Sequence, residues 1–194
     1  MYLLNAQQIH HYVNETPFGT YLDIVNFREH ALQHTTYYFA LGRNYDVLDG
    51  ELAVPKRLTS DARHVAIPAR GYVVVKTHET FHLSDKVIGV LGAVSDLTKR
   101  GLQLVHSPFI DPIFHGQLTL GIHNCLDCEV TLKLGMSIGK VSFFDISDTY
   151  PVGVIPGSAQ DRKFRQLVGR EDEDPIPFED DDDSELLSKK PWQK

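Results

Sequence analysis

The chain has few of the residues that would crosslink it covalently or carry it into a membrane. Its 194 residues include two cysteines, two methionines and one tryptophan, so a framework of several disulfides is excluded. No apolar run approaches the roughly 18–20 residues that a membrane-spanning helix needs. The first residues lack a basic segment and a small-residue cleavage site, so we expect no secretory signal peptide and no membrane partner. These absences favour a globular protein of the cytoplasm.

Positive charge is not in excess, and negative charge is concentrated at one end. Of the 26 acidic residues, 10 fall within residues 171–185, and residues 1–170 hold 16 acidic and 16 basic residues. A neutral body has no overall basic field to attract DNA or RNA, so we expect no nucleic-acid partner. The composition predicts one domain over residues 1–170 and an acidic, flexible tail over residues 171–194. The tail is either a solvated segment or an arm that binds a protein partner. The second alternative is open because the polar segment LLSKKPWQK, which follows the acidic run, contains a tryptophan.

The two cysteines, Cys125 and Cys128, form a single CxxC in the segment NCLDC. A CxxC can be a redox pair or half of a zinc site, but no second CxxC is present, and His123 lies only two residues before Cys125. The flanking segments QLTLGIHN and EVTLKLG alternate like strands, which predicts a hairpin across CLDC. We interpret the pair as structural turn cysteines, with a metal or redox role as the alternative. Free thiols favour a reducing compartment.

Short strands dominate the pattern between Tyr37 and Phe144. HVAIPARGYVVVKT places a Pro-Ala-Arg-Gly turn between two apolar runs, and KVIGVLGAV and GMSIGKVSFFDI are further apolar strands. Near the N-terminus, Asn5 can cap a short amphipathic helix, and in DLTKRGL Asp96 can cap a single helical turn that Gly101 ends. Closely spaced strands with no long helix between them predict an all-β sandwich or barrel with a short N-terminal helix.

A longer pattern resembles a known family. The segments LSDKVIGVLGAVSDLTKRGLQLVHSPFIDPIFHGQLTLGIHN and LKLGMSIGKVSFF are similar to the dCTP deaminase branch of the dUTPase superfamily, in which Ile-Asp-Pro-Gly-aromatic-x-Gly precedes Gly-Met-x-Ile. Over residues 1–167 the resemblance implies a distorted jelly-roll β-fold and a homotrimer with sites between subunits. It implies a deoxynucleotide ligand, with Mg²⁺ as cofactor when a nucleoside triphosphate is bound. It is compatible with a cytoplasmic protein or an intracellular one encoded by a virus or phage.

Five positions match residues that bind nucleotide in that family. Asp111 matches the aspartate of Ile-Asp-Pro, whose counterpart in dUTPases activates the attacking water and contacts the deoxyribose. Phe114 matches the aromatic residue under the sugar, where a 2′-hydroxyl would clash or stay unpaired. Ser95 matches a phosphate-binding serine, and Lys99 stands for an arginine, keeping the charge but losing the bidentate fork. Lys163 matches the lysine of a C-terminal segment that closes over the phosphates.

Other positions depart from the family pattern. Val94 replaces an arginine that clamps the triphosphate, and Asp96 puts a negative charge beside the expected phosphate. Tyr38 replaces an aspartate that in dUTPases helps to hold the metal, and Ile113 replaces a glycine. Gly121 replaces the glutamate that shuttles a proton in the deaminases, and glycine cannot supply general acid–base catalysis, typically worth about 10²–10⁴-fold. The sequence therefore predicts a degraded deaminase site.

Two functional hypotheses follow. In the first, deaminase activity is lost and the protein is a trimeric nucleotide-binding, regulatory or structural module. In the second, the protein is an enzyme that hydrolyses or deaminates dUTP or dCTP with Asp111 as its base. His106, His115 or His123 would then supply a lost group, since histidine titrates near neutral pH.

A zinc-dependent base deaminase of the His-x-Glu type is a third class, and the sequence does not support it. That chemistry needs His-x-Glu followed by Pro-Cys-x-x-Cys. Here Glu79 directly follows His78, and no proline precedes Cys125.

Overall fold

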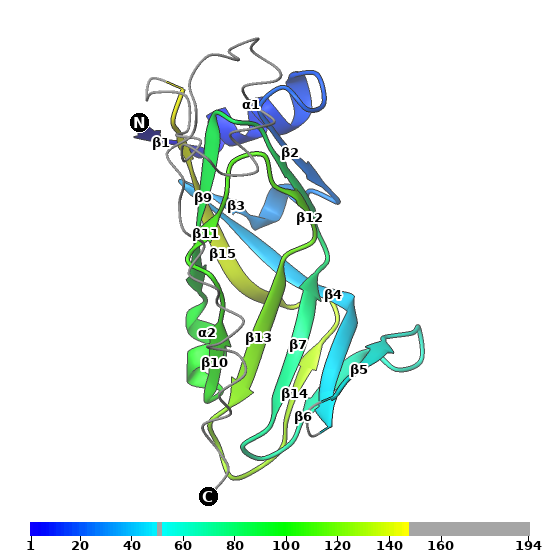
Figure 1. Ribbon diagram of the computed structural model, residues 1–194. Helices are drawn as coiled ribbons and strands as arrows, with labels where there is room; N and C mark the ends of the chain where they lie inside the picture. The colour runs from blue at the N-terminus through cyan, green and yellow to red at the C-terminus, as the bar shows by residue number, and fades with distance from the viewer. Residues whose placement is uncertain (50–51, 148–194) are drawn as a thin grey trace, which may run out of the picture. The chain divides into compact units, whose positions relative to one another are not determined.

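The computed structural model describes residues 1–49 and 52–147 of the chain (Figure 1). Its helices are α1 (Ala6–Glu15), α2 (Ser95–Lys99) and the 3-10 turn η1 (Glu29–Ala31). No helix in these ranges is long and apolar enough to cross a membrane. The strands are β1 (Tyr2–Leu3), β2 (Leu22–Val25), β3 (Leu32–Gln33), β4 (Thr36–Asp49), β5 (Leu52–Arg57), β6 (His64–Ile67), β7 (Tyr72–Thr77), β8 (Thr80–Leu83), β9 (Val87–Ala93), β10 (Leu102–Val105), β11 (Phe109–Ile110), β12 (His115–Gly116), β13 (Thr119–Asn124), β14 (Val130–Lys133) and β15 (Ser137–Asp145).

Most strands belong to one antiparallel sheet with the order β10-β13-β7-β4-β15-β9-β11. The long strand β4 joins the two halves of this sheet, because it pairs with β5 and β7 along one part and with β15 along another. The sheet curls into a half-barrel, and smaller sheets, β12-β8-β2 and β14-β6, complete the described structure (Figure 1). The predicted all-β class and the N-terminal helix are confirmed. The predicted domain end at residue 170, the tail over 171–194 and Lys163 lie outside the described residues.

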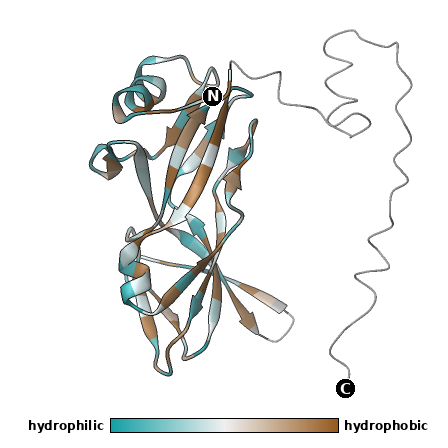
Figure 2. Ribbon diagram, turned by 90° about the vertical axis from the view of Figure 1, so that its left-hand side faces the viewer, coloured by the Kyte–Doolittle hydropathy of each residue, from teal (hydrophilic) through white to brown (hydrophobic). Residues whose placement is uncertain are grey.

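Alternating side chains form the core along the strands. In β15, Val141 and Phe143 are fully buried, whereas the residues that alternate with them, Lys140, Ser142 and Phe144, are partly exposed. Figure 2 shows the same alternation as hydrophobic and hydrophilic bands along the strands. Phe81 lies at the centre of an aromatic group, with Tyr37 and Phe39 each packed edge-on at ring-centroid distances of 6.4 Å. Such pairs add about 0.5–1.5 kcal/mol each beyond their buried area.

The N-terminal segment is tied to the end of β15 by a buried carboxylate. Asp145, which is 2% exposed, accepts hydrogen bonds from the hydroxyls of Tyr2 (2.8 Å) and Tyr21 and from the backbone N–H (2.7 Å) and hydroxyl (2.6 Å) of Ser147. Burial alone would raise the pKa of Asp145, but the hydrogen bonds from Ser147, Tyr21 and Tyr2 outweigh it and lower the pKa to about 2. The ionised carboxylate therefore holds β1 against β15.

The two helix-cap predictions have different outcomes. Asn5 caps α1 as predicted: its side chain accepts from the backbone N–H of Gln8 at 2.9 Å, and the Gln8 side chain accepts from the Asn5 N–H at 3.0 Å. For α2 the predicted cap is wrong, because the N-cap residue is Val94 and Asp96 lies inside the first turn. Asp96 instead pairs with Arg100 one turn later, at 3.2 Å. Asp96 lies two positions after the N-cap, which is too late in the chain to cap the helix.

The predicted hairpin across CLDC is also wrong. β13 pairs with β7 and β10, whereas β14 pairs with β6. The reason is Asn124, which is fully buried and whose side-chain amide donates to the carbonyls of Ile67 (3.1 Å), Pro68 (2.9 Å) and Cys128 (2.8 Å). These bonds draw the loop onto the β6–β7 turn and send the chain to a different sheet. Cys125 and Cys128 are free and exposed on this loop.

Candidate functional site

The Ile-Asp-Pro segment forms a tight turn between β11 and β12. The N–H of Phe114 donates to the carbonyl of Asp111 at 3.3 Å, and Pro112 and Ile113 occupy the two central positions. Ile113 has φ +65°, which makes this the pattern of a type II turn, and glycine is favoured at that position. An isoleucine in this conformation costs about 1–2 kcal/mol, and here it is 65% exposed, so burial does not offset the strain. Backbone strain of this kind concentrates at binding and catalytic sites.

This turn contributes to a cavity of about 320 Å³, which we call the Asp111 cavity. Asp111 and Phe114 lie in its wall together with apolar residues such as Leu91 and polar residues such as Gln117 and Thr119. Gln117 is held in place because its side-chain amide donates to the carbonyl of Thr77 at 2.7 Å. An apolar wall with a few fixed polar groups is typical of small-molecule sites. The structure therefore brings together the two residues expected to contact the deoxyribose.

A second cavity, of about 470 Å³, lies beside α2, and we call it the Ser95 cavity. Ser95, Asp96 and Tyr38 line it, together with Lys140, which is in register with Tyr38 across β15 and β4. Lys140 was not identified from the sequence, because no family motif marks it. The charge of Asp96 is partly compensated by its ion pair with Arg100. The cavity therefore has two serines, Ser95 and Ser137, and one lysine that can contact an anion.

The predicted site residues do not meet in one cavity of a single chain. Leu91 of the Asp111 cavity and Ala93 of the Ser95 cavity are two residues apart on β9, but Asp111 and Ser95 line different cavities. Lys99 is exposed and lines neither of them.

The three histidines considered as catalytic substitutes lie elsewhere and line neither cavity. The Nδ1 atom of His115 is 2.9 Å from that of His82 on the neighbouring strand. The Nδ1 atom of His106 is 2.6 Å from the carbonyl of Ser107, and that of His123 is 3.6 Å from the sulfur of Cys125. Within one chain, none of them replaces a lost catalytic group in these cavities.

The position of Gly121 is filled by another side chain. A Cβ atom at Gly121 would lie 1.7 Å from Oη, 2.4 Å from Cζ and 2.8 Å from Cε2 of Tyr72 on the adjacent strand β7. These distances are far inside van der Waals contact, so no side chain fits at residue 121 while the Tyr72 ring is in place. The phenol of Tyr72 thus occupies the space beside residue 121, the position at which the resemblance places the family's glutamate. Sequence reasoning missed Tyr72, because this contact joins strands far apart in the chain.

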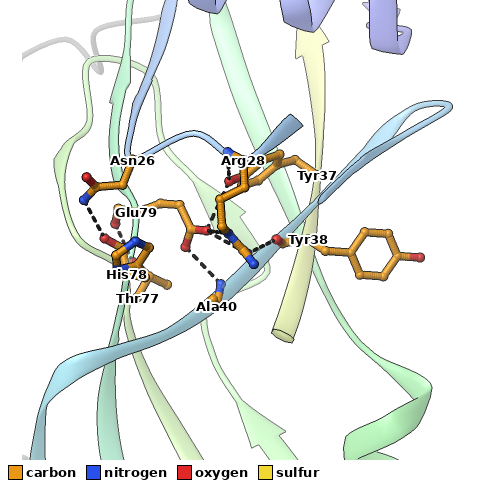
Figure 3. Close-up of polar contacts among 8 residues, drawn as sticks. All are labelled: Asn26, Arg28, Tyr37, Tyr38, Ala40, Thr77, His78 and Glu79. Carbon is orange, nitrogen blue, oxygen red and sulfur yellow. Dashed lines mark hydrogen bonds and ion pairs between the residues drawn. The ribbon is translucent and has the colours of Figure 1, made fainter. Parts of the chain in front are cut away.

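Glu79 and Arg28 form a buried ion pair next to β4 (Figure 3). Glu79 is 0% exposed, and its Oε1 accepts from Arg28 Nε at 2.9 Å and from the hydroxyl of Tyr37 at 3.1 Å. Its Oε2 accepts from the N–H of Ala40 at 2.9 Å, and Arg28 Nη2 donates to the carbonyl of Tyr38 at 2.7 Å. Figure 3 shows the Tyr38 ring pointing away from this cluster. The pair therefore fixes the β4 backbone at the carbonyl of Tyr38, which lines the Ser95 cavity, and at the N–H of Ala40.

Burial and the carboxylate of Glu79 together raise the pKa of Tyr37 to about 12, so the phenol stays a hydrogen-bond donor to that carboxylate. Both carboxylate oxygens of Glu79 accept hydrogen bonds from groups of the fold, so Glu79 has a structural role.

The residues present do not fit a resident metal ion. Tyr38 stands where the family resemblance places a metal-binding aspartate, and its phenol is a weak ligand for Mg²⁺, which prefers carboxylate and water oxygens. Over residues 1–49 and 52–147, no three His, Cys, Asp or Glu side chains are grouped so as to hold a metal ion.

Comparison with known proteins agrees with these observations. The model of the dCTP deaminase-like family matches residues 3–146. The dCTP deaminase of Pyrococcus horikoshii is 31% identical over 122 residues, which cover 63% of this chain and 74% of that protein. The dUMP-forming dCTP deaminase of Beutenbergia cavernae is 42% identical over 78 residues, which cover 39% of this chain and 40% of that protein. The match thus spans about two fifths of the Beutenbergia protein.

A solved structure shows the same fold. The 2′-deoxycytidine 5′-triphosphate deaminase from Agrobacterium tumefaciens superimposes with a TM-score of 0.59 at 12% sequence identity, covering 73% of this chain and 47% of that chain. The predicted dUTPase-like β-fold is confirmed by this likeness. The match of the family model over residues 3–146 shows that the chain belongs to the dCTP deaminase-like family.

Proposed function

We propose that the protein hydrolyses the phosphate chain of a pyrimidine deoxynucleoside triphosphate, with Asp111 as the base, and does not deaminate the base of the nucleotide. The observation that carries this proposal is the joint position of Asp111 and Phe114 in one cavity, on a strained turn. Phe114 would pack under the deoxyribose, and the exposed Asp111 carboxylate can accept a proton from water.

In the proposed step, a water oxygen attacks the α-phosphorus while Asp111 accepts a proton from that water. The bond between the α-phosphorus and the bridging oxygen breaks, and pyrophosphate leaves with the electron pair of that bond. The products from dUTP are dUMP and pyrophosphate. Mg²⁺ enters with the triphosphate and offsets its charge.

Two features support hydrolysis over deamination. Gly121 offers no carboxylate, and Tyr72 fills the space that one would need. The Beutenbergia cavernae relative is named for forming dUMP, a product that requires loss of two phosphates from dCTP as well as deamination. The family therefore includes a protein that both removes phosphates and deaminates. We propose that the present protein keeps the removal of phosphates without the deamination.

We propose that the complete site forms between subunits of a homotrimer. Within one chain Ser95 and Asp111 line different cavities, which supports an arrangement in which Ser95 of a second copy faces Asp111. A mass measurement in solution tests this: a trimer is expected, and a monomer that turns over nucleotide would contradict it.

A second candidate function is nucleotide binding without turnover, as in a regulatory module. The specific observation in its favour is that Val94 leaves the Ser95 cavity without the arginine of the family clamp. Without this positioning group a nucleotide could be held but not hydrolysed.

The test is pyrophosphate release from dUTP and dCTP with Mg²⁺ by the full chain. Asp111→Asn is expected to lower the rate by about 10²–10⁴-fold. Asp61→Asn, at an exposed aspartate outside all of these cavities, is the matched control and should behave as the unmodified protein. Turnover unaffected by Asp111→Asn would exclude the proposed base. Binding of either nucleotide without turnover would favour the regulatory module.

A further inference from the structure

Lys140 of β15 extends over the neighbouring strand β9. It is in register with Gly92 of β9 on one side and with Tyr38 of β4 on the other, so the three residues lie on one face of the sheet. A Cβ atom at Gly92 would lie 3.4 Å from Cε and 3.6 Å from Cγ of Lys140. The aliphatic stem of Lys140 therefore lies across the glycine, where no side chain competes for the space. Both Lys140 and Ala93, the last residue of β9, line the Ser95 cavity.

The ammonium group of Lys140 is available to an anion in this cavity. Within residues 1–49 and 52–147, Lys140 forms no ion pair with a carboxylate, since Asp96, the carboxylate among the lining residues, pairs with Arg100 at 3.2 Å. The hydroxyls of Ser95 and Ser137 line the same cavity. An ammonium group has three N–H donors and each hydroxyl has one, whereas phosphate oxygens accept hydrogen bonds. The lining therefore has the donors and the unpaired positive charge that a phosphate group needs.

The apolar residue Val94 shows what this lysine can compensate for. Val94, where the family resemblance places an arginine, also lines the Ser95 cavity and is 6% exposed. Its side chain carries no charge and donates no hydrogen bond. Lys140 brings one positive charge to the same cavity from β15, a strand that comes much later in the chain. The cation is thus moved from the start of α2 to another strand but stays in the same cavity.

We propose that Lys140 binds the phosphate chain of the nucleotide in the Ser95 cavity and supplies the positive charge that the chain lacks at residue 94. This inference rests on the proposed function, in which the sugar of the same nucleotide lies beside Asp111 of a neighbouring copy. A lysine offers a point charge without the bidentate fork of an arginine. Lys140 therefore contributes mainly to the affinity for the charged phosphates, and the sugar and the base are bound without it.

The experiment is titration of the full chain with dUTP and Mg²⁺ by calorimetry, and with deoxyuridine, which has no phosphate, by NMR. Lys140→Gln is expected to weaken dUTP binding about tenfold, the loss of one charge-assisted hydrogen bond, and to leave deoxyuridine binding unchanged. Lys140→Arg keeps the charge and should bind dUTP within about threefold of the unmodified protein. Lys133→Gln, at an exposed strand lysine outside these cavities, is the matched control and should bind both compounds as the unmodified protein does.

The outcomes separate this inference from the proposed function. If Lys140→Gln binds dUTP normally while the unmodified protein releases pyrophosphate, the role of Lys140 is wrong and the proposed function stands. Equal weakening of dUTP and deoxyuridine binding would also overturn the inference, because the lysine would then act through the fold and not through the phosphates. Binding of dUTP that depends on Lys140, without release of pyrophosphate, would support the inference and contradict the proposed hydrolysis. If the unmodified protein does not bind dUTP, both are wrong.

Discussion

The contact between Tyr72 and Gly121 makes a quantitative prediction about stability. Because a Cβ at residue 121 would lie 1.7 Å from Oη and 2.4 Å from Cζ of Tyr72, Gly121→Ala must displace the ring. Overpacking of this kind usually costs about 1–3 kcal/mol. Tyr72 is partly exposed and its ring can swing toward solvent, so we expect a cost of about 1–2 kcal/mol, near the lower end of that range.

A double-mutant cycle isolates this contact. In a Tyr72→Ala background the space at residue 121 is empty, so Gly121→Ala should then cost almost nothing, giving a coupling energy of about 1–2 kcal/mol. Tyr72→Phe is the control: it removes only the hydroxyl, and Cζ, 2.4 Å from the added Cβ, still collides. Urea denaturation of the variants measures the free energies of unfolding. If the two substitutions are additive, or if Tyr72→Phe relieves the cost as fully as Tyr72→Ala, the ring does not fill this space.

Three further predictions concern the described structure. Glu79→Gln should lower the free energy of unfolding by about 3 kcal/mol, because it leaves the Arg28 guanidinium partly buried without its counter-charge; a loss under 1 kcal/mol in urea denaturation would contradict this. The folded-state pKa of Asp145 is about 2, below its ordinary value of 3.8, so its stabilisation is complete above about pH 5 and is lost as the pH falls toward 2. Asp145→Asn should therefore flatten the acid limb of a stability–pH curve, and an unchanged limb would exclude this role. Ile113→Gly should raise the free energy of unfolding by up to about 1 kcal/mol or leave it unchanged, because glycine accepts the positive φ but costs more chain entropy on folding. A clear decrease in the free energy of unfolding would contradict the strain at this turn.

Much of the fold follows from local rules and could be predicted. The Asn5 cap depends on residues three apart, and the strands β9 and β15 show as apolar runs in the sequence. The Ile-Asp-Pro and Gly-Met-x-Ile segments indicated the family, and the pairing of Asp111 with Phe114 in one cavity agrees with it. These features are encoded within a few residues of each other.

The features that were missed depend on which strands become neighbours. The partner of β13 is β7 and not β14, because Asn124 bonds to the β6–β7 turn. That pairing also brings Tyr72 over Gly121 and Lys76 beside Thr119. No local pattern of hydrophobic or charged residues specifies these neighbours, so the filled space beside residue 121 could not be inferred from the sequence.

In the proposed function, the Asp111 site hydrolyses the phosphate chain of a deoxynucleoside triphosphate and does not deaminate its pyrimidine ring. The most direct measurement follows ammonia and pyrophosphate together while the full chain is incubated with dUTP and with dCTP in the presence of Mg²⁺. We expect release of pyrophosphate that depends on Asp111, and no ammonia from dCTP. Release of ammonia from dCTP by the unmodified protein would contradict the proposed function, because it would show that deamination proceeds with glycine at residue 121.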